Sequence, residues 1–246
     1  MALHTEMQTQ GNFLFRNRSY LPIIFLTIGL GVYLFGEYNE VETSENFISQ
    51  YFEYICLSIC LLGLLIRIKT VGHTPPKTSG RNTKVGQVAD ELNTSGLYSL
   101  VRHPLYVGNF FMWLGVAMLT ENLWFTIAFI LLYTIYYERI MYAEEQFLIA
   151  KFGDRYTDWS KTTPAFIPHF KNYRKPKYPF NNKKVIKKEK NGLVAIFVLF
   201  WLFEWASDVL EHGITHFDFN GWFYSAIATS VLYLILKIMK KRKMLN

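Results

Sequence analysis

The chain has 246 residues, of which 51% are hydrophobic and 17% aromatic, and its formal net charge is +7. This length suits one sizeable domain, but ordinary soluble domains are less apolar, so the composition favours an integral membrane protein. The basic excess could indicate a nucleic-acid-binding surface. The Lys and Arg residues, however, lie in short loops beside apolar segments, where anionic lipid head groups are the expected partner. We therefore expect membrane lipids, and no nucleic acid, as partners.

Six apolar stretches follow one another along the chain, at residues 20–35, 51–68, 105–119, 123–137, 193–205 and 222–239. A helix needs about 20 apolar residues to cross the hydrocarbon core. The first, second and sixth stretches reach that length with their flanking residues. The third and fourth are near the lower limit, and the fifth needs residues 206–210 to qualify. We predict an all-α integral membrane protein, with a bundle of about six transmembrane helices that forms a single polytopic domain over residues 1–246.

The charges between these stretches alternate in sign along the chain. Basic residues precede the first stretch, lie between the second and third and between the fourth and fifth, and follow the sixth, while the other connections are acidic. With six crossings, all 26 Lys and Arg residues fall on one side. An excess of basic residues marks the cytoplasmic side of a membrane protein. We predict that both termini are cytoplasmic, in a bacterial inner membrane or an endomembrane.

A polar cluster stands where the third span is predicted to begin. Pro104 suits the first turn of a helix, because its missing N–H would be unpaired there anyway. Arg102, His103 and Tyr106 then lie at a helix N-terminus, which favours anions through its free N–H groups and its dipole. Arg adds a forked donor for carboxylate or phosphate. Gly108 has no side chain, so a ligand or another helix can approach closely there.

A pair of carboxylates is expected on the same side of the membrane. The fourth helix has no Pro or Gly between the membrane and Gly153, so it should continue to that residue and carry Glu144 and Glu145 near its end. The third and fourth spans are antiparallel, so their cytoplasmic ends meet. An anion-binding group would thus face two carboxylates, which is a suitable cradle for a zwitterionic or cationic ligand.

These residues form part of a longer pattern. Arg-His-Pro-Leu-Tyr-Val-Gly occupies residues 102–108, Glu-Glu residues 144–145, and Phe-Gly-Asp-Arg-Tyr residues 152–156, before a Pro-containing tail. The pattern closely resembles the signature of the isoprenylcysteine carboxyl methyltransferase and phospholipid methyltransferase superfamily of membrane enzymes. The resemblance covers a core at residues 96–168, and the predicted helical hairpin at 193–239 lies outside it.

The resemblance implies S-adenosylmethionine as methyl donor, bound at the cytoplasmic face, and a lipidic acceptor that enters from the bilayer. Carried over by matching position, the donor-binding residues are Tyr98, Arg102, His103, Tyr106, Gly108, Glu144, Glu145 and Tyr156, with Phe166 as a supporting contact. Arg102 and Glu145 are the candidate catalytic residues. The chain departs from the family at Trp159, where a second Tyr usually stands, so a hydroxyl is lost there.

Such a site needs positioning and electrostatics more than a covalent intermediate, because a sulfonium group already activates the donor's methyl. Three acceptors stay open: a prenylcysteine-type carboxylate, a phospholipid amine and a lipid phosphate. The two anionic acceptors are ionised at pH 7 and need no general base, whereas an amine would need deprotonation, for which Glu145 is the nearest candidate. No metal is expected.

Two other classes of function were weighed against methyl transfer. Membrane reductases of sterols or other lipids, which use NADPH, have a similar C-terminal pattern but tend to place Asn before the Tyr and an acidic residue after the Gly. Here Leu105 and Asn109 stand at those positions. A transporter would be expected to show inverted repeats or broken helices, which the sequence lacks, and a non-catalytic scaffold is the remaining alternative. We therefore predict a membrane methyltransferase; nothing in the pattern indicates its oligomeric state.

Overall fold

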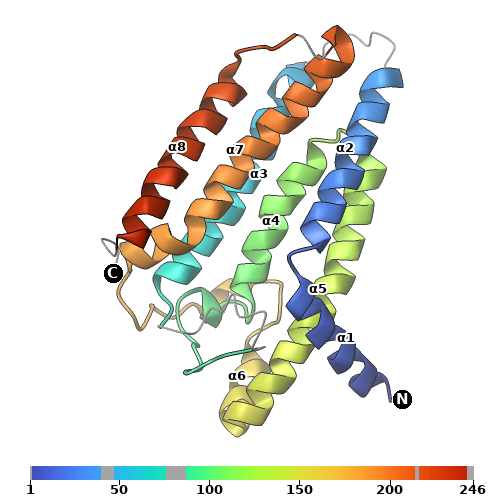
Figure 1. The fold of residues 1–246 in the computed structure, drawn as a ribbon. Helices are drawn as coiled ribbons and strands as arrows, with labels where there is room; N and C mark the ends of the chain where they lie inside the picture. The colour runs from blue at the N-terminus through green and yellow to red at the C-terminus, as the bar shows by residue number, and fades with distance from the viewer. Residues whose placement is uncertain (1, 40–46, 76–86, 214–215, 243–246) are drawn as a thin grey trace.

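The computed structural model describes residues 2–39, 47–75, 87–213 and 216–242, and over these ranges the chain is helical with short connections. Long helices run side by side from one end of the bundle to the other (Figure 1). The helices are α1 (Leu3–Asn17), α2 (Leu21–Asn39), α3 (Phe47–Gly72), α4 (Pro104–Met118), α5 (Leu123–Phe152), α6 (Asp154–Thr162), α7 (Asn182–His212) and α8 (Gly221–Lys241), with 3-10 turns η1 (Leu97–Ser99) and η2 (Phe170–Asn172).

All six predicted apolar stretches are helical in the structure. Five helices, α2, α3, α5, α7 and α8, are long and apolar enough to cross a membrane, whereas α4 is apolar but has only 15 residues. Each predicted helix end that rests on Pro or Gly is confirmed: α4 begins at Pro104, and α5 continues to Phe152 with Gly153 at a positive φ of 54°. Glycine reaches that region without the steric cost that a side chain would add.

α3 and α4 form the tightest helix pair, and glycines allow their close approach. A Cβ on Gly63 would lie 2.5 Å from the carbonyl oxygen of Gly108, and a Cβ on Gly115 would lie 2.5 Å from the carbonyl oxygen of Cys56. Small residues at a helix interface let backbones approach where no hydrophobic force drives association, because lipid is as apolar as the helices themselves. Gly115 thus serves close packing of α4 against α3.

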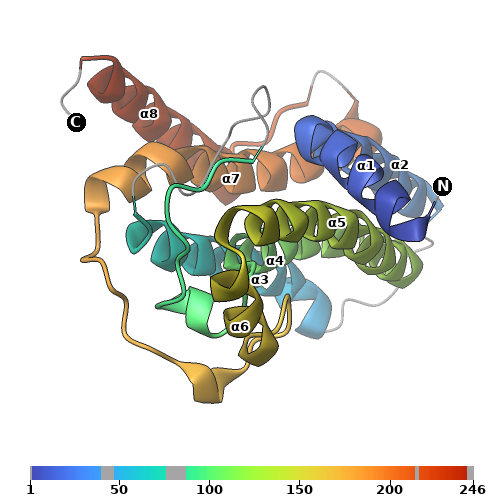
Figure 2. The same cartoon turned by 90° about the horizontal axis from the view of Figure 1, so that it is seen from below.

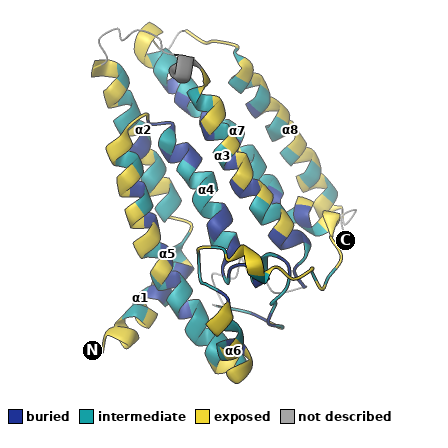
Figure 3. Cartoon of the chain, turned by 180° about the vertical axis from the view of Figure 1, so that it is seen from behind, coloured by how far each residue is buried: buried dark blue, intermediate teal, exposed yellow. Residues whose placement is uncertain are grey.

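α7 packs against this pair and closes the larger of two cores. Buried residues from α3, α4 and α7 form it: Cys56, Cys60, Leu64, Val116, Leu119, Ile196, Phe200 and Phe203. In contrast, α2 and α8 bury little, and Figure 3 shows their outer faces exposed. A helix with apolar, exposed faces at this length is what a lipid environment requires.

The helix α1 was not predicted, because residues 1–11 read as a polar N-terminus. It lies against the middle of α5, and Gly11 and Phe15 are buried in the contact. Tyr136 donates a hydrogen bond to the carbonyl of Leu14 at 3.2 Å. A Cβ on Gly11 would clash with the carbonyl oxygen of Arg139. The N-terminal segment is thus part of the folded body at the end where α4 begins.

The start of α7 also differs from expectation. The predicted fifth span was residues 193–205, which leaves the basic run 183–190 outside it. In the structure the helix begins at Asn182, whose preceding residue Asn181 accepts a hydrogen bond from the Lys184 N–H at 2.8 Å. This side-chain cap satisfies an otherwise unpaired N–H of the first turn. The basic run is therefore the first two turns of α7, and one of its residues, Glu189, is buried.

Seen along the bundle axis, α6 and residues 163–181 cross the end at which α4 and α7 begin (Figure 2). This segment is tied to the turn before α4: the Gly96 N–H donates to the Arg174 carbonyl at 3.0 Å, and the Arg102 N–H to the Pro164 carbonyl at 2.8 Å. The segment is largely irregular, and its backbone hydrogen bonds fix the turn that carries Arg102.

Candidate functional site

A cavity of about 590 Å³ opens at this end of the bundle. Its walls come from the α1–α2 connection, α3, residues 87–93, the start of α4, the second half of α5, α6 and the start of α7. Its charged and aromatic lining consists of Phe15, Arg18, Arg67, Glu91, Tyr98, Arg102, His103, Tyr106, Glu144, Phe147, Trp159, Lys188 and Glu189. Ligand sites in proteins usually have volumes of about 300–1,000 Å³. The cavity is therefore large enough for a ligand of cofactor size.

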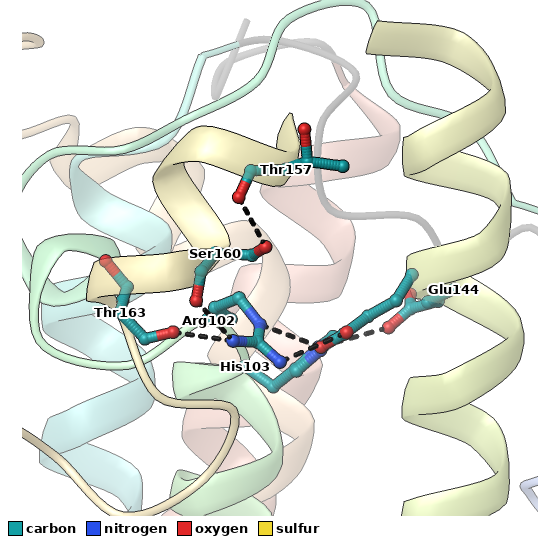
Figure 4. A network of polar contacts seen from close by, with 7 residues as sticks. Arg102, His103, Glu144, Thr157, Ser160 and Thr163 are labelled. Carbon is teal, nitrogen blue, oxygen red and sulfur yellow. Dashed lines mark hydrogen bonds and ion pairs between the residues drawn. The ribbon is translucent and has the colours of Figure 1, made fainter. Parts of the chain in front are cut away.

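Arg102 is the hub of a polar network on one side of the cavity (Figure 4). Its Nε and Nη2 donate to the two carboxylate oxygens of Glu145 at 2.8 and 3.1 Å. Its Nη1 donates to the carbonyls of Ser160 at 3.1 Å and Thr163 at 2.6 Å. A bidentate Arg–carboxylate pair fixes geometry as well as charge. Arg102 thereby joins α5 to the last turn of α6.

His103 bridges the two carboxylates. Its Nε2 lies 2.9 Å from Glu145 Oε1, and its Nδ1 lies 3.5 Å from Glu144 Oε2. Burial by itself lowers the pKa of His103, but hydrogen bonds and charge from Glu144 and Glu145 outweigh it, so the pKa is raised above its ordinary value. The ring stacks on Tyr106 with centroids 5.6 Å apart. The histidine is thus buried and oriented, and its pKa is raised by the two carboxylates.

The structure brings five of the eight sequence-predicted site residues to the cavity wall: Tyr98, Arg102, His103, Tyr106 and Glu144. Burial, followed by the negative charge of Glu144, raises the pKa of Tyr98 and keeps its hydroxyl protonated. Glu145 lies behind the wall, where it holds Arg102 and His103. The spatial prediction that the guanidinium and imidazole before α4 meet the carboxylates of α5 is confirmed.

The remaining predicted residues lie elsewhere. Gly108 faces α3, where a Cβ would lie 2.5 Å from Arg67 Cγ. It therefore accommodates a helix, the second of the two uses expected for it. Tyr156 is 1% exposed and packs against Trp159, with ring centroids 5.5 Å apart. Phe166 packs edge-on against Phe110 at 5.8 Å. In the described residues, Gly108, Tyr156 and Phe166 thus support the wall instead of lining it.

Sequence reasoning missed a second polar cluster on the cavity wall. Arg67 pairs with Glu189 through Nε–Oε2 at 2.7 Å and Nη2–Oε1 at 2.9 Å, and its Nη1 donates to Asn109 Oδ1 at 2.5 Å. Arg67 had been counted among loop charges. Its position before the last residue of the stretch 51–68 was the available signal, because ionisable residues inside membrane helices usually have a functional partner.

Residues 87–93, which precede α4 and line one side of the cavity, form its covering segment. Residues far away in sequence hold this segment in place. Glu91 accepts hydrogen bonds from Lys177 Nζ at 2.6 Å and from the Tyr178 hydroxyl. The bond from Lys177, and then that from Tyr178, lowers the pKa of Glu91. Gln87 donates to Asn12 Oδ1 on α1 at 2.9 Å. The cover of the cavity is thus attached to both α1 and the connection that precedes α7.

Comparison with known proteins identifies the family. The family model described as phospholipid methyltransferase matches residues 51–155. The cobalt-zinc-cadmium resistance protein CzcN of Cupriavidus metallidurans is 32% identical over 165 residues, which cover 66% of this chain and 69% of the relative. The chain belongs to the isoprenylcysteine carboxyl methyltransferase and phospholipid methyltransferase superfamily.

Two further members of this superfamily are protein-S-isoprenylcysteine O-methyltransferases. That of Schizosaccharomyces pombe is 33% identical over 124 residues, 50% of this chain and 52% of the relative. That of Tribolium castaneum is 29% identical over 143 residues, 58% of this chain and 48% of the relative. The chain thus spans about half the length of these two enzymes. No solved structure matches the chain. The superfamily, the apolar helices and these relatives support a membrane methyltransferase.

Proposed function

We propose that this protein transfers a methyl group from S-adenosylmethionine to a lipidic acceptor embedded in the membrane. The observation that carries the proposal is the contact of His103 with both Glu144 and Glu145 on the wall of a cavity at the end of the helix bundle. The matched family segment contains all three residues.

The cavity suits the donor in size and in chemical character. Its wall combines acidic and basic groups with the aromatic side chains of Tyr98, Tyr106 and Trp159. The donor has a carboxylate, an amino group and a flat base, so it needs both signs of charge and an apolar surface. When bound, it supplies an electrophilic methyl group on a positively charged sulfur.

Each residue of the network receives a role from its contacts. Both ring nitrogens of His103 are engaged by Glu144 and Glu145, so the imidazole would orient Glu144 instead of donating to the donor's carboxylate. Glu144 faces the cavity and is 26% exposed, so it would bind the donor's amino group or a ribose hydroxyl. Arg102 has four of its five N–H groups engaged by Glu145 and two carbonyls. Arg102 and Glu145 would therefore position His103 instead of contacting the donor.

The same arrangement bears on the chemical step. Both oxygens of Glu145 already accept hydrogen bonds, so this carboxylate is poorly placed as a general base for an amine. Catalysis would rest on orientation, on exclusion of water and on preorganised charge. We further propose that the cavity faces the cytoplasm, since the basic connections of the chain lie at its end of the bundle.

Donor binding by the purified protein tests this function. Titration calorimetry in detergent is expected to show binding of S-adenosylmethionine to the wild type and at least a tenfold loss of affinity in E144Q and H103A, because charged hydrogen bonds contribute about 1.5–3 kcal/mol each. H212A, at the exposed end of α7, serves as the control and should bind normally. Unchanged donor affinity in both site variants, or binding of NADPH in place of S-adenosylmethionine, would contradict the proposal.

A further inference from the structure

The cluster of Arg67, Asn109 and Glu189 joins three helices at the cavity wall. Arg67 comes from α3, Asn109 from α4 and Glu189 from α7, and the carboxylate of Glu189 is 4% exposed. A buried ion pair loses the hydration of both charges, and apolar residues of similar volume often give the same stability or more. Packing alone thus gives little reason for this pair, although it does hold α7 against α3.

Arg67 retains donors for a ligand. Each terminal guanidinium nitrogen carries two N–H groups, and each uses one: Nη1 on Asn109 and Nη2 on Glu189. The side chain lines the cavity and keeps 20% exposure. Within the described part of the chain, one N–H on each terminal nitrogen is left over, and guanidinium N–H groups are strong donors to a carboxylate or phosphate.

The family motif makes room for this arginine. Gly108 lies beside Arg67, and any side chain there would meet the Cγ of Arg67 and the backbone of α3. Asn109, the next residue, receives the guanidinium. The glycine of the Arg-His-Pro-x-Tyr-x-Gly segment therefore serves Arg67 as well as the packing of two helices.

The cluster lies deeper in the bundle than the donor-binding network. Asn109 follows His103 by six residues, which is about 9 Å along α4 at 1.5 Å per residue. An acceptor whose apolar tail stays in the bilayer would bring its head group to the deeper side, while the soluble donor would enter from the open end. The network around His103 and the cluster around Arg67 are thus separated along the axis of α4. The donor would approach from the side of His103 and the acceptor head group from the side of Arg67.

We propose that Arg67 binds an anionic head group of the lipidic acceptor, a carboxylate or a phosphate, and that Glu189 and Asn109 position its guanidinium. This assignment rests on the proposed methyl transfer. Both oxygens of Glu189 are engaged by Arg67, so the cluster offers no carboxylate to an acceptor amine. Residues 182–241, which lie beyond the matched family segment, would then contribute to the choice of acceptor through Glu189.

The test measures binding of lipids without turnover. Fluorescent farnesylcysteine, its methyl ester, farnesyl phosphate and farnesylamine are titrated onto the purified wild type. Charged hydrogen bonds to Arg67 should make the carboxylate or the phosphate bind about ten- to a hundredfold more tightly than the uncharged ester. The two anions distinguish a carboxylate from a phosphate acceptor. Tighter binding of the amine than of both anions would overturn the assignment.

The decisive variant is R67Q/E189Q, because it removes the guanidinium without leaving a buried carboxylate unpaired. It should lose the preference for the anion over the ester and keep its affinity for S-adenosylmethionine. R67K, which keeps the charge but not the fork, should restore part of the preference. K161Q removes an exposed cation from α6 and should change nothing. If R67Q/E189Q keeps the anion preference, Arg67 is not the acceptor site, even where donor binding has confirmed the proposed function.

Discussion

His103 depends on its neighbours for the charge that the proposed site needs. An isolated buried imidazole would be neutral, because burial disfavours the charged form. Glu144 and Glu145 reverse that preference. Arg102 in turn keeps Glu145 in place from the side of α6. Two adjacent pairs of residues that lie 41 to 43 positions apart in sequence thus act as one unit, and removing one of the four residues should impair the others.

The raised pKa of His103 gives stability a defined dependence on pH. Since this pKa is higher in the folded than in the unfolded protein, the stabilisation is fully present below about pH 6.5 and is lost as pH rises through the folded-state pKa. Thermal unfolding in detergent measures this dependence. Between pH 6 and pH 9 the difference in Tm between the wild type and H103Q should shrink, by about 2–4 °C for each kcal/mol of unfolding free energy that His103 no longer contributes. H212Q should show no such trend; a constant difference between wild type and H103Q would argue against a charged His103.

At the scale of elements, α1 shows how one position sets a helix contact. Gly11 lies directly against the backbone of α5 at Arg139. Replacing it by Leu overpacks the contact, which typically costs about 1–3 kcal/mol. G11L should therefore release α1 and make its peptide bonds accessible to limited proteolysis. G31A is the matched control, since a Cβ on Gly31 meets nothing within 4 Å. Equal protease resistance of G11L and wild type would show that α1 is held by other contacts.

Release of α1 in G11L should also disturb the cavity wall. Phe15 lines the wall, and Asn12 accepts the hydrogen bond of Gln87 from the covering segment. G11L is thus expected to weaken donor binding several-fold without touching a donor-binding residue, whereas G31A should not. Calorimetry on the same preparations measures both effects. Normal donor affinity in a G11L protein with a protease-sensitive α1 would show that the cavity forms without this helix.

At the scale of the whole molecule, both ends of the helical chain lie at the same end of the bundle (Figure 1), and the residues that line the cavity belong to this end. An even number of helices between the two ends, here six, brings both termini to the same end. We predict that this end is cytoplasmic. A membrane-impermeant maleimide should label H212C in intact cells and label K161C only after permeabilisation. The native Cys56 and Cys60 are fully buried and should stay unlabelled. The reverse pattern would invert the topology.

The sequence by itself determined that the six apolar stretches are helical, where α4 begins and α5 ends, and that Arg102, His103, Glu144 and Glu145 belong together. These features depend on local signals. Apolar length indicates a membrane helix, Pro and Gly mark helix ends, and the two ends of an antiparallel pair must meet. A motif that repeats a family signature added the chemistry.

Only the tertiary structure decided that α1 docks on α5, that Gly108 faces a helix and that Arg67 pairs with Glu189 across 122 residues. Such contacts depend on how helices rotate about their axes and how closely they pack, and apolar composition all around a membrane helix carries little information on either. A charge at the edge of an apolar stretch looks the same whether it anchors the protein in lipid head groups or turns inward. Its partner on another helix decides which, and that partner is visible only in the folded chain.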